Sequence, residues 1–219
     1  MKSLVTAILV LICGTVSFGS IILYTPSAGD CTASWNTKSS SIGYGSIGGN
    51  TMGVYLSFGG SYGNDYTVSI FEIPIASLSG KTLSSATLEV DSLGFDTGYY
   101  SGSAQIGWFN TGTSTLTGNV VADELGSTKP LPGGYEIWDT YDLPNGAGAK
   151  SFDFTTQVQT DIDAGRTYST FVLHGSRETY GSIYTSESGQ GPRIVATLIP
   201  EPATLLSLAF GFLMLRKKK

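Results

Sequence analysis

The sequence predicts an all-β protein, an antiparallel two-sheet sandwich of jelly-roll type. Three observations lead to this expectation. The chain of 219 residues holds 29 glycines, 12 tyrosines and 10 phenylalanines, a composition typical of short strands joined by tight turns. Short runs alternate between apolar and polar residues with the period of two that a half-buried strand shows. Charged residues are only 13% of the chain, which disfavours a long exposed helix, and 41% are hydrophobic, which disfavours a disordered chain.

This alternation marks seven expected strands. The clearest runs from Ala86 to Asp91, where Ala86, Leu88 and Val90 alternate with polar residues. Turn signals rich in Gly, Asn and Pro separate the strands, and no strand–helix alternation is present, which favours a sandwich over a parallel sheet. The other six strands are expected at 52–56, 67–73, 105–109, 151–155, 168–174 and 193–198.

One segment has helical spacing. Val158 and Ile162 lie four residues apart within Thr156 to Ala164, Asp153 or Thr155 is placed to cap the start, and Gly165 ends the run,. The stretch from 123 to 148, rich in Pro and Gly, is expected to be a long surface loop or insertion.

Both ends of the chain carry apolar segments next to positive charge. Lys2, the apolar run 4–12 and the small residues 14–19 predict a signal peptide over residues 1–19, because the run is too short to span a membrane. At the other end Pro200, Glu201 and Pro202 precede the apolar run 203–215 and four cations. This run predicts a short transmembrane helix of roughly 20 Å at 1.5 Å per residue, which suits a transient anchor. The alternatives are an uncleaved N-terminal anchor and an ordinary tail anchor.

Charge and cysteine content narrow the choice of partner for residues 20–199, which form the expected body. Five of the 12 Lys and Arg residues and one of the 17 acids lie in the terminal segments. The body therefore carries seven cations and 16 acids, a net charge near −9. Such a body does not bind nucleic acid by neutralising phosphates, and it has no electrostatic attraction to anionic lipid. Cys13 leaves with the signal peptide, so Cys31 has no internal disulfide partner and no cysteine-based metal site is expected.

The C-terminal arrangement resembles the PEP-CTERM sorting signal of Gram-negative bacteria, in which a Pro-Glu-Pro motif, a hydrophobic helix and a basic tail are recognised by an exosortase. The resemblance covers residues 200–219, and it implies that Pro200, Glu201 and Pro202 are the sorting motif. It further implies export through the inner membrane, transient anchoring there, and a final place at the cell surface or in the extracellular matrix.

Five segments of the body carry a second resemblance: 70–75, 83–90, 152–158, 174–178 and 191–196. They resemble segments of the DNRLRE-type domain, a family similar to carbohydrate-binding modules. This resemblance implies a non-catalytic surface module, a β-sandwich that binds sugar. The chain departs from the family pattern between Asn119 and Lys150, where the family's Trp-containing segment has no clear match.

The sequence shows no catalytic constellation. His174 is the single histidine, no Gly-x-Ser-x-Gly elbow accompanies it, and one histidine cannot build a zinc site; we expect it at a strand end, hydrogen-bonded to its surroundings. A glycosidase needs only two carboxylates, and Glu178, Glu187, Asp139 and Asp142 are candidates. A structural calcium ion held by Asp139 and Asp142, or by the Asn64-Asp65 turn, is the other option, with solvated loop acids the favoured interpretation. No cofactor is expected.

Aromatic residues in the unmatched region suggest a sugar platform. Tyr and Trp offer an apolar ring with a polar tip, which suits stacking on a pyranose. Arg177 is expected either to pair with Glu178 or to hold a sugar carboxylate. Tyr99 and Tyr100 form a second candidate pair, and core packing is the alternative for all these aromatics. The candidate carbohydrate-binding residues are Tyr135, Trp138, Asp139, Tyr141, Asn145 and Arg177.

These observations favour an exported, non-catalytic protein associated with exopolysaccharide. Two alternatives stay open. One is a structural matrix protein without a discrete ligand. The other is a polysaccharide-active enzyme, which ranks last because the sequence shows no catalytic constellation.

Overall fold

The structure is a computed structural model, and it describes residues 20–26, 30–36, 42–46, 51–58, 64–96, 103–109, 137–176 and 179–200. Several predicted features lie outside the described residues: the signal peptide 1–19, the sorting-signal residues after Pro200, and Tyr99, Tyr100, Tyr135, Arg177 and Glu178. For Trp138 and Asp139 the backbone is described and the side chain is not.

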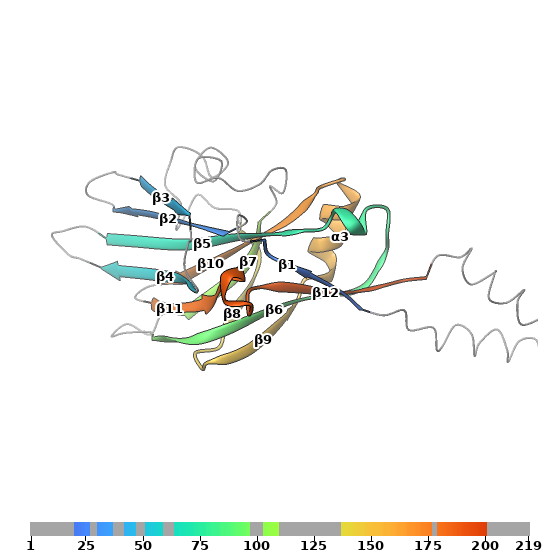
Figure 1. Ribbon diagram of the computed structural model, residues 1–219. Coiled ribbons are helices and arrows are strands. Elements are labelled where there is room, and N and C mark those ends of the chain that lie inside the picture. Colours follow the sequence, from blue (N-terminus) through green and yellow to red (C-terminus); the bar gives the residue numbers. More distant parts are fainter. Residues whose placement is uncertain are drawn as a thin grey trace, which may run out of the picture.

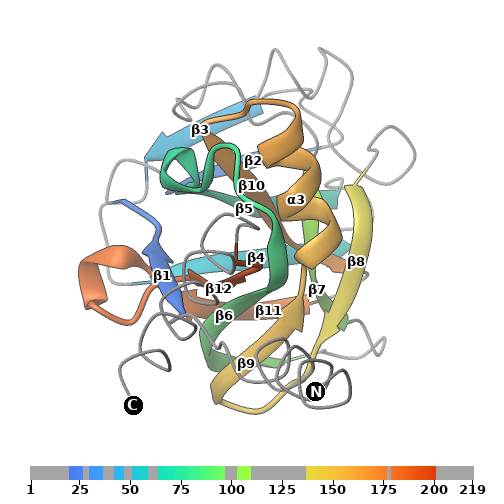
Figure 2. The same ribbon diagram turned by 90° about the vertical axis from the view of Figure 1, so that its right-hand side faces the viewer.

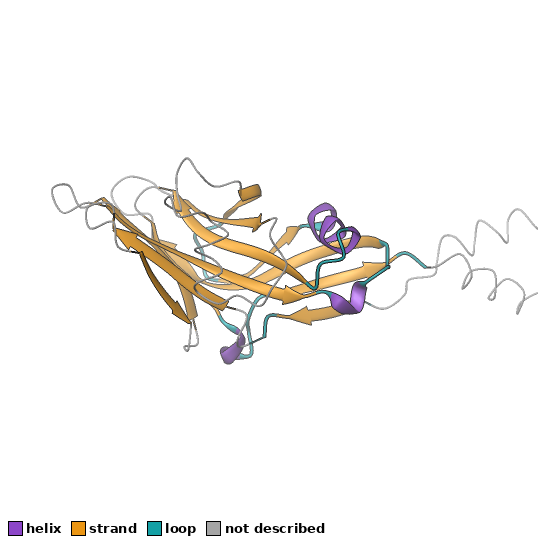
Figure 3. Cartoon of the chain, turned by 90° about the horizontal axis from the view of Figure 1, so that it is seen from above, coloured by secondary structure: helices purple, strands orange, loops and turns teal. Residues whose placement is uncertain are grey.

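Strands dominate the described chain, and all their pairings are antiparallel (Figure 3). The one described α-helix, α3, spans Thr155–Asp163, and two short 3-10 helices span Ala76–Leu78 (η2) and Ser186–Ser188 (η4). The twelve described strands are β1 (Ile21–Tyr24), β2 (Asp30–Asn36), β3 (Ile42–Ser46), β4 (Thr51–Phe58), β5 (Asn64–Pro74), β6 (Leu83–Asp96), β7 (Ser103–Phe109), β8 (Ile137–Leu143), β9 (Gly148–Asp153), β10 (Tyr168–Ser176), β11 (Thr179–Tyr184) and β12 (Arg193–Leu198).

The strands form two facing layers joined at one side, which confirms the all-β, sandwich-like class (Figures 1 and 2). One layer holds β1, β12, β6 and β9, and the other holds β3, β2, β5, β10, β7 and β8. β11 and β4 bridge the layers, because β11 pairs with the last part of β6 and β4 pairs with the first part of β5. The long strand β5 pairs with β2, β4 and β10, and the long strand β6 pairs with β9, β11 and β12.

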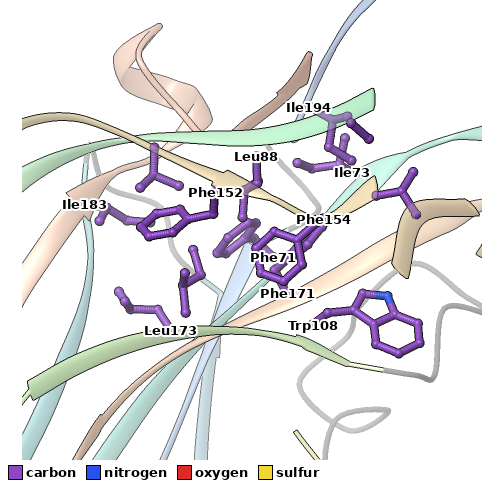
Figure 4. Packing of buried hydrophobic residues seen from close by; sticks show 14 of the residues in the cluster. Phe71, Ile73, Leu88, Trp108, Phe152, Phe154, Phe171, Leu173, Ile183 and Ile194 are labelled. Carbon is purple, nitrogen blue, oxygen red and sulfur yellow. The ribbon is translucent and has the colours of Figure 1, made fainter. Parts of the chain in front are cut away.

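The core lies between the layers and is built by the predicted alternation. Ala86, Leu88 and Val90 of β6 are buried in one cluster with side chains from β5, β7 and β10. Figure 4 shows Leu88 among them. Phe71 and Phe171 stack with ring centroids 5.6 Å apart, and Phe154 meets Phe171 edge-on at 5.1 Å. Each fully buried side chain of this size stabilises the fold by about 1.5–3 kcal/mol.

All seven expected strands are present, and five further strands were not expected: β1, β2, β3, β8 and β11. The expectation of a loop over 123–148 was wrong at β8, because residues 137–143 pair with β7. The register of this pair shifts between Gly107 and Trp108, so that Trp108 lies opposite Trp138, Gly107 lies opposite Thr140, and Asp139 is the extra residue of a bulge,.

The helix was predicted to within one residue at each end. Asp153 accepts hydrogen bonds from the Thr155 backbone N–H (3.0 Å) and from the Thr155 hydroxyl (2.6 Å), so the carboxylate satisfies one of the free donors of the first turn. Both hydrogen bonds lower the pKa of Asp153, and the bond from the Thr155 hydroxyl has the larger effect. Gly165 follows the helix at φ +70°, a conformation that favours glycine.

The first and last described strands are neighbours. β1 pairs with β12, and Ile21 lies opposite Ala196. Because the pair is antiparallel, Ser20 and Pro200 leave the body at the same end (Figure 1). None of the helices in the described ranges is long and apolar enough to cross a membrane.

Candidate functional site

Tyr141, a predicted platform residue on β8, packs against two phenylalanine rings. Its ring lies against Phe152 (centroids 5.7 Å apart) and meets Phe154 edge-on at 5.0 Å. Its hydroxyl donates a hydrogen bond to the Asp153 carbonyl at 2.6 Å. The side chain is half-buried against the core, so the contacts it makes fasten β8 to β9 and to the start of α3.

Asp142 and Asn145 lie close to Tyr141 along the chain and are exposed. Asp142 accepts hydrogen bonds from the Gln105 amide (2.9 Å) and the Ser103 hydroxyl (3.4 Å) on the neighbouring strand β7. Asn145 lies in the turn between β8 and β9, and its backbone carbonyl accepts the N–H of Phe95 at 3.0 Å. The fold therefore brings these predicted residues to one hairpin. Glu187, a predicted carboxylate, lies apart from them on η4 between β11 and β12, where the Ser186 hydroxyl donates to it at 3.2 Å.

A second surface, which sequence reasoning did not single out, lies on the outer side of the layer β1–β12–β6–β9. We call it the open face. One row of directly paired residues crosses its four strands, and a second row lies beside it. The first row is Tyr24, Arg193, Glu89 and Ser151; the second is Ile22, Val195, Thr87 and Asp153. Three inter-strand spacings make each row about 14 Å wide.

The centre of the open face is an ion-pair cluster. Arg193 Nε donates to Glu89 Oε2 at 2.8 Å, and an η nitrogen donates to Asp91 Oδ2 at 3.3 Å. Partial burial lowers the pKa of Arg193, but the hydrogen bonds and charges of Glu89 and Asp91 outweigh it and hold the pKa above its ordinary value. Tyr24 is 54% exposed and lies directly opposite Arg193 on the neighbouring strand.

A different polar cluster lies in the interior. The carboxylate of Asp161, on α3, is fully buried. One oxygen accepts the Trp108 indole N–H (2.9 Å) and the Ser169 hydroxyl (2.5 Å), and the other pairs with Arg166 at 2.5 Å. Burial raises the pKa of Asp161; the bonds from Ser169, Trp108 and Arg166 lower it, and the net shift is upward. The Asp161 carboxylate has no exposed surface, and its hydrogen bonds tie the helix to β7 and β10.

His174 lies late in β10, as expected, and is buried. The expected hydrogen bonding was wrong for one ring nitrogen: within the described part of the chain, Nε2 has no partner. Burial lowers the pKa of His174 to about 4. A neutral imidazole closed off from solvent does not fit the role of a catalytic base that exchanges protons with a substrate.

The described residues contain no group of three or more His, Cys, Asp or Glu side chains placed to hold a metal ion. Comparison with known proteins adds no assignment: no protein-family model matches the chain, and no curated protein matches it. The geometry itself offers an open face with an exposed aromatic ring, a fixed guanidinium and carboxylate oxygens. That set of groups can bind a polar ligand through stacking and hydrogen bonds.

Proposed function

We propose that this protein is an exported, non-catalytic module that binds polysaccharide at the cell surface or in the extracellular matrix. The observation that carries the proposal is the row from Tyr24 through Arg193 to Glu89 on the open face. The jelly-roll type of the sandwich and the similarity of the body to DNRLRE-type and carbohydrate-binding domains are part of the same proposal.

The row offers the three kinds of contact that sugar recognition uses. The Tyr24 ring is exposed and suits stacking on the apolar face of a pyranose. Arg193 is held by two carboxylates, so its remaining N–H groups are pre-oriented donors, and little side-chain entropy is lost on binding. The free lone pairs of Glu89 and Asp91 accept hydrogen bonds from hydroxyls. Since the two carboxylates exceed the one guanidinium, the face favours a neutral glycan over an anionic one.

The two terminal segments are the basis for a proposed route of export and anchoring. We propose that residues 1–19 direct export through the inner membrane of a Gram-negative bacterium. The segment from Pro200 through Glu201 and Pro202 to Lys219 then anchors the chain transiently until an exosortase-type protease acts. The hydropathy and terminal cations of these segments support this route.

Affinity electrophoresis of residues 20–199, which hold all described strands, tests the proposal. The gels contain neutral or anionic polysaccharides, the host's own among them. We expect a neutral glycan to retard the wild-type body and Tyr24→Ala to abolish the retardation. Trp138→Ala and Glu187→Ala are matched comparisons, because Trp138 belongs to the predicted platform on β8 and Glu187 lies exposed on η4.

The outcomes separate the candidate functions. Retardation lost in Trp138→Ala and kept in Tyr24→Ala moves the site to the 135–145 region. No retardation by any glycan contradicts sugar binding and leaves the structural matrix protein. Turnover of a polysaccharide contradicts the non-catalytic assignment.

A further inference from the structure

We propose that one end of the folded body is a lipid-facing surface that contacts a phospholipid bilayer while the chain is anchored. We call it the exit end and define it by residues 20–22, 76–84 and 198–200. The inference rests on the proposed anchoring of the C-terminal apolar segment, and it adds which part of the body meets the membrane.

The fold places both chain exits at this end. β1 starts at Ile21 opposite Ala196 of β12, so Ser20 and Pro200 lie at the same end of the body. The N–H of Ile199 donates to the Thr82 carbonyl at 2.8 Å, which ties the C-terminal exit to the loop that precedes β6. The exit is therefore part of the folded body up to Ile199.

Chain length then fixes how far the body can stand from the membrane. The apolar run begins at Ala203, three residues after Pro200. At an upper limit of about 3.6 Å per residue, the two are at most about 11 Å apart. The headgroup region on each side of the hydrocarbon core is only several ångströms thick. An apolar run seated in the core thus holds the exit end at the headgroup level.

The side chains at the exit end suit that position. Ile22 and Ile199 are 48% and 49% exposed, and they are two of the five large hydrophobic residues exposed in the described ranges. The segment from Ile75 to Ser85 contains one cation, Lys81, and no acid, although the body carries a net charge near −9. Exposed aliphatic side chains gain free energy when they leave water at the membrane boundary, whereas carboxylates lose hydration there.

Two acidic residues on the strands that lead to this end lie far from it. Asp65 and Asp96 occupy the opposite ends of β5 and β6. One exposed acid, Asp163 in the last turn of α3, lies beside the exit end, because the Gln159 amide donates both to its carboxylate at 2.8 Å and to the Lys81 carbonyl at 3.2 Å. With the exit end on the bilayer, the strands stand away from the membrane, and the row at Tyr24 stays accessible on the side of the body.

The test uses the full chain in phosphatidylcholine vesicles whose headgroups carry a nitroxide quencher. Cys13→Ser and Cys31→Ser remove the native thiols, and a fluorophore is attached to Ile22→Cys, Ser79→Cys or Asn145→Cys. Asn145 is the control, because its turn lies beside Phe95 near the far end of β6. A form that starts at Ser20 repeats the measurement without the N-terminal segment, whose removal deletes no described strand.

We expect fluorophores at positions 22 and 79 to lose most of their emission in vesicles, and the fluorophore at 145 to keep it, in both forms of the chain. Equal quenching at all three positions, in a chain that floats with the vesicles, overturns the lipid-facing surface and leaves the anchoring intact. A chain that does not float with the vesicles overturns the anchoring and this inference together; sugar binding by the body is measured separately and does not depend on either.

Discussion

Two clusters in this protein pair an arginine with carboxylates, and they differ in nearly every physical respect. Arg166 and Asp161 meet in the interior, where the carboxylate is fully buried and accepts hydrogen bonds from three side chains. Arg193, Glu89 and Asp91 meet on the open face, where all three side chains are partly exposed. The same chemical groups therefore have two different roles. The buried cluster fixes a helix on a sheet, and the exposed cluster presents oriented polar groups to solvent.

The contrast follows from the cost of removing charge from water. A buried carboxylate is tolerated only when nearly every lone pair has a donor, and Asp161 gains its donors from three separate elements. An exposed ion pair needs no such enclosure, because water solvates what the partner does not. Variants of the two clusters should therefore separate loss of stability from loss of binding.

The largest expected effect is that of Asp161→Ala. Trp108, Ser169 and Arg166 lose their acceptor together, so we expect the free energy of unfolding to fall by about 3–5 kcal/mol. Urea denaturation of the body measures it. Asp163→Ala, two residues further along α3 at an exposed position, is the matched control and should cost less than about 0.5 kcal/mol. Similar losses in the two variants would contradict the structural role of the buried cluster.

The second effect concerns a buried group with an unsatisfied nitrogen, His174. Its pKa is lowered to about 4 in the fold, whereas the unfolded chain titrates at its ordinary value near 6.5. The unfolded state thus binds more protons between these values, and stability is lost as the pH falls from about 6.5 to about 4, by about 3 kcal/mol in all.

Urea midpoints at pH 7.5, 5.5 and 4 measure this loss. His174→Leu carries no titrating ring and should lose about 3 kcal/mol less between pH 7.5 and pH 4 than the wild-type body. The upward pKa shift of Asp161 acts in the opposite sense, since acid favours the folded state through that group, but it is common to both proteins and cancels in the difference. Parallel pH profiles of the two proteins would contradict the assigned burial of His174.

The seven strands predicted from sequence are those with clear alternation, and four of the five missed strands lack it. The exception is β2, in which Cys31, Ala33 and Trp35 alternate with polar residues, so this strand was predictable from its pattern. β3 and β11 contain glycines within their runs, and β1 has only four residues. Their pairing is decided by neighbours far along the chain, such as Tyr180 opposite Tyr55, which local pattern does not encode. β8 was missed for a related reason: its partner β7 is separated from it along the chain by a long segment, so the pairing is not encoded locally.

The open face was predictable only in part. Glu89 and Arg193 stood in segments that the sequence analysis singled out, but 104 residues separate them, and only the register of β12 on β6 joins them. Tyr24 gave no signal, because its strand was not expected. Asp161 was missed because its donors Trp108 and Ser169 belong to other elements. Residues that act as a group across strands become visible only once the pairing is known.

The smallest expected effect on stability, and the sharpest test of the comparison, is that of Arg193→Ala. Its partners remain hydrated, so the free energy of unfolding should change by less than about 1 kcal/mol, although the variant removes two ion pairs. Retardation by a neutral glycan should nevertheless be lost. Arg193→Lys keeps the charge but not the planar fork that contacts two carboxylates, so it should keep the stability and weaken the retardation. If Arg193→Ala instead lowered the free energy of unfolding by several kcal/mol, this cluster would have a structural role like that of the Asp161 cluster. Unchanged stability with unchanged retardation would remove Arg193 from the sugar-binding row and leave Tyr24 to account for it.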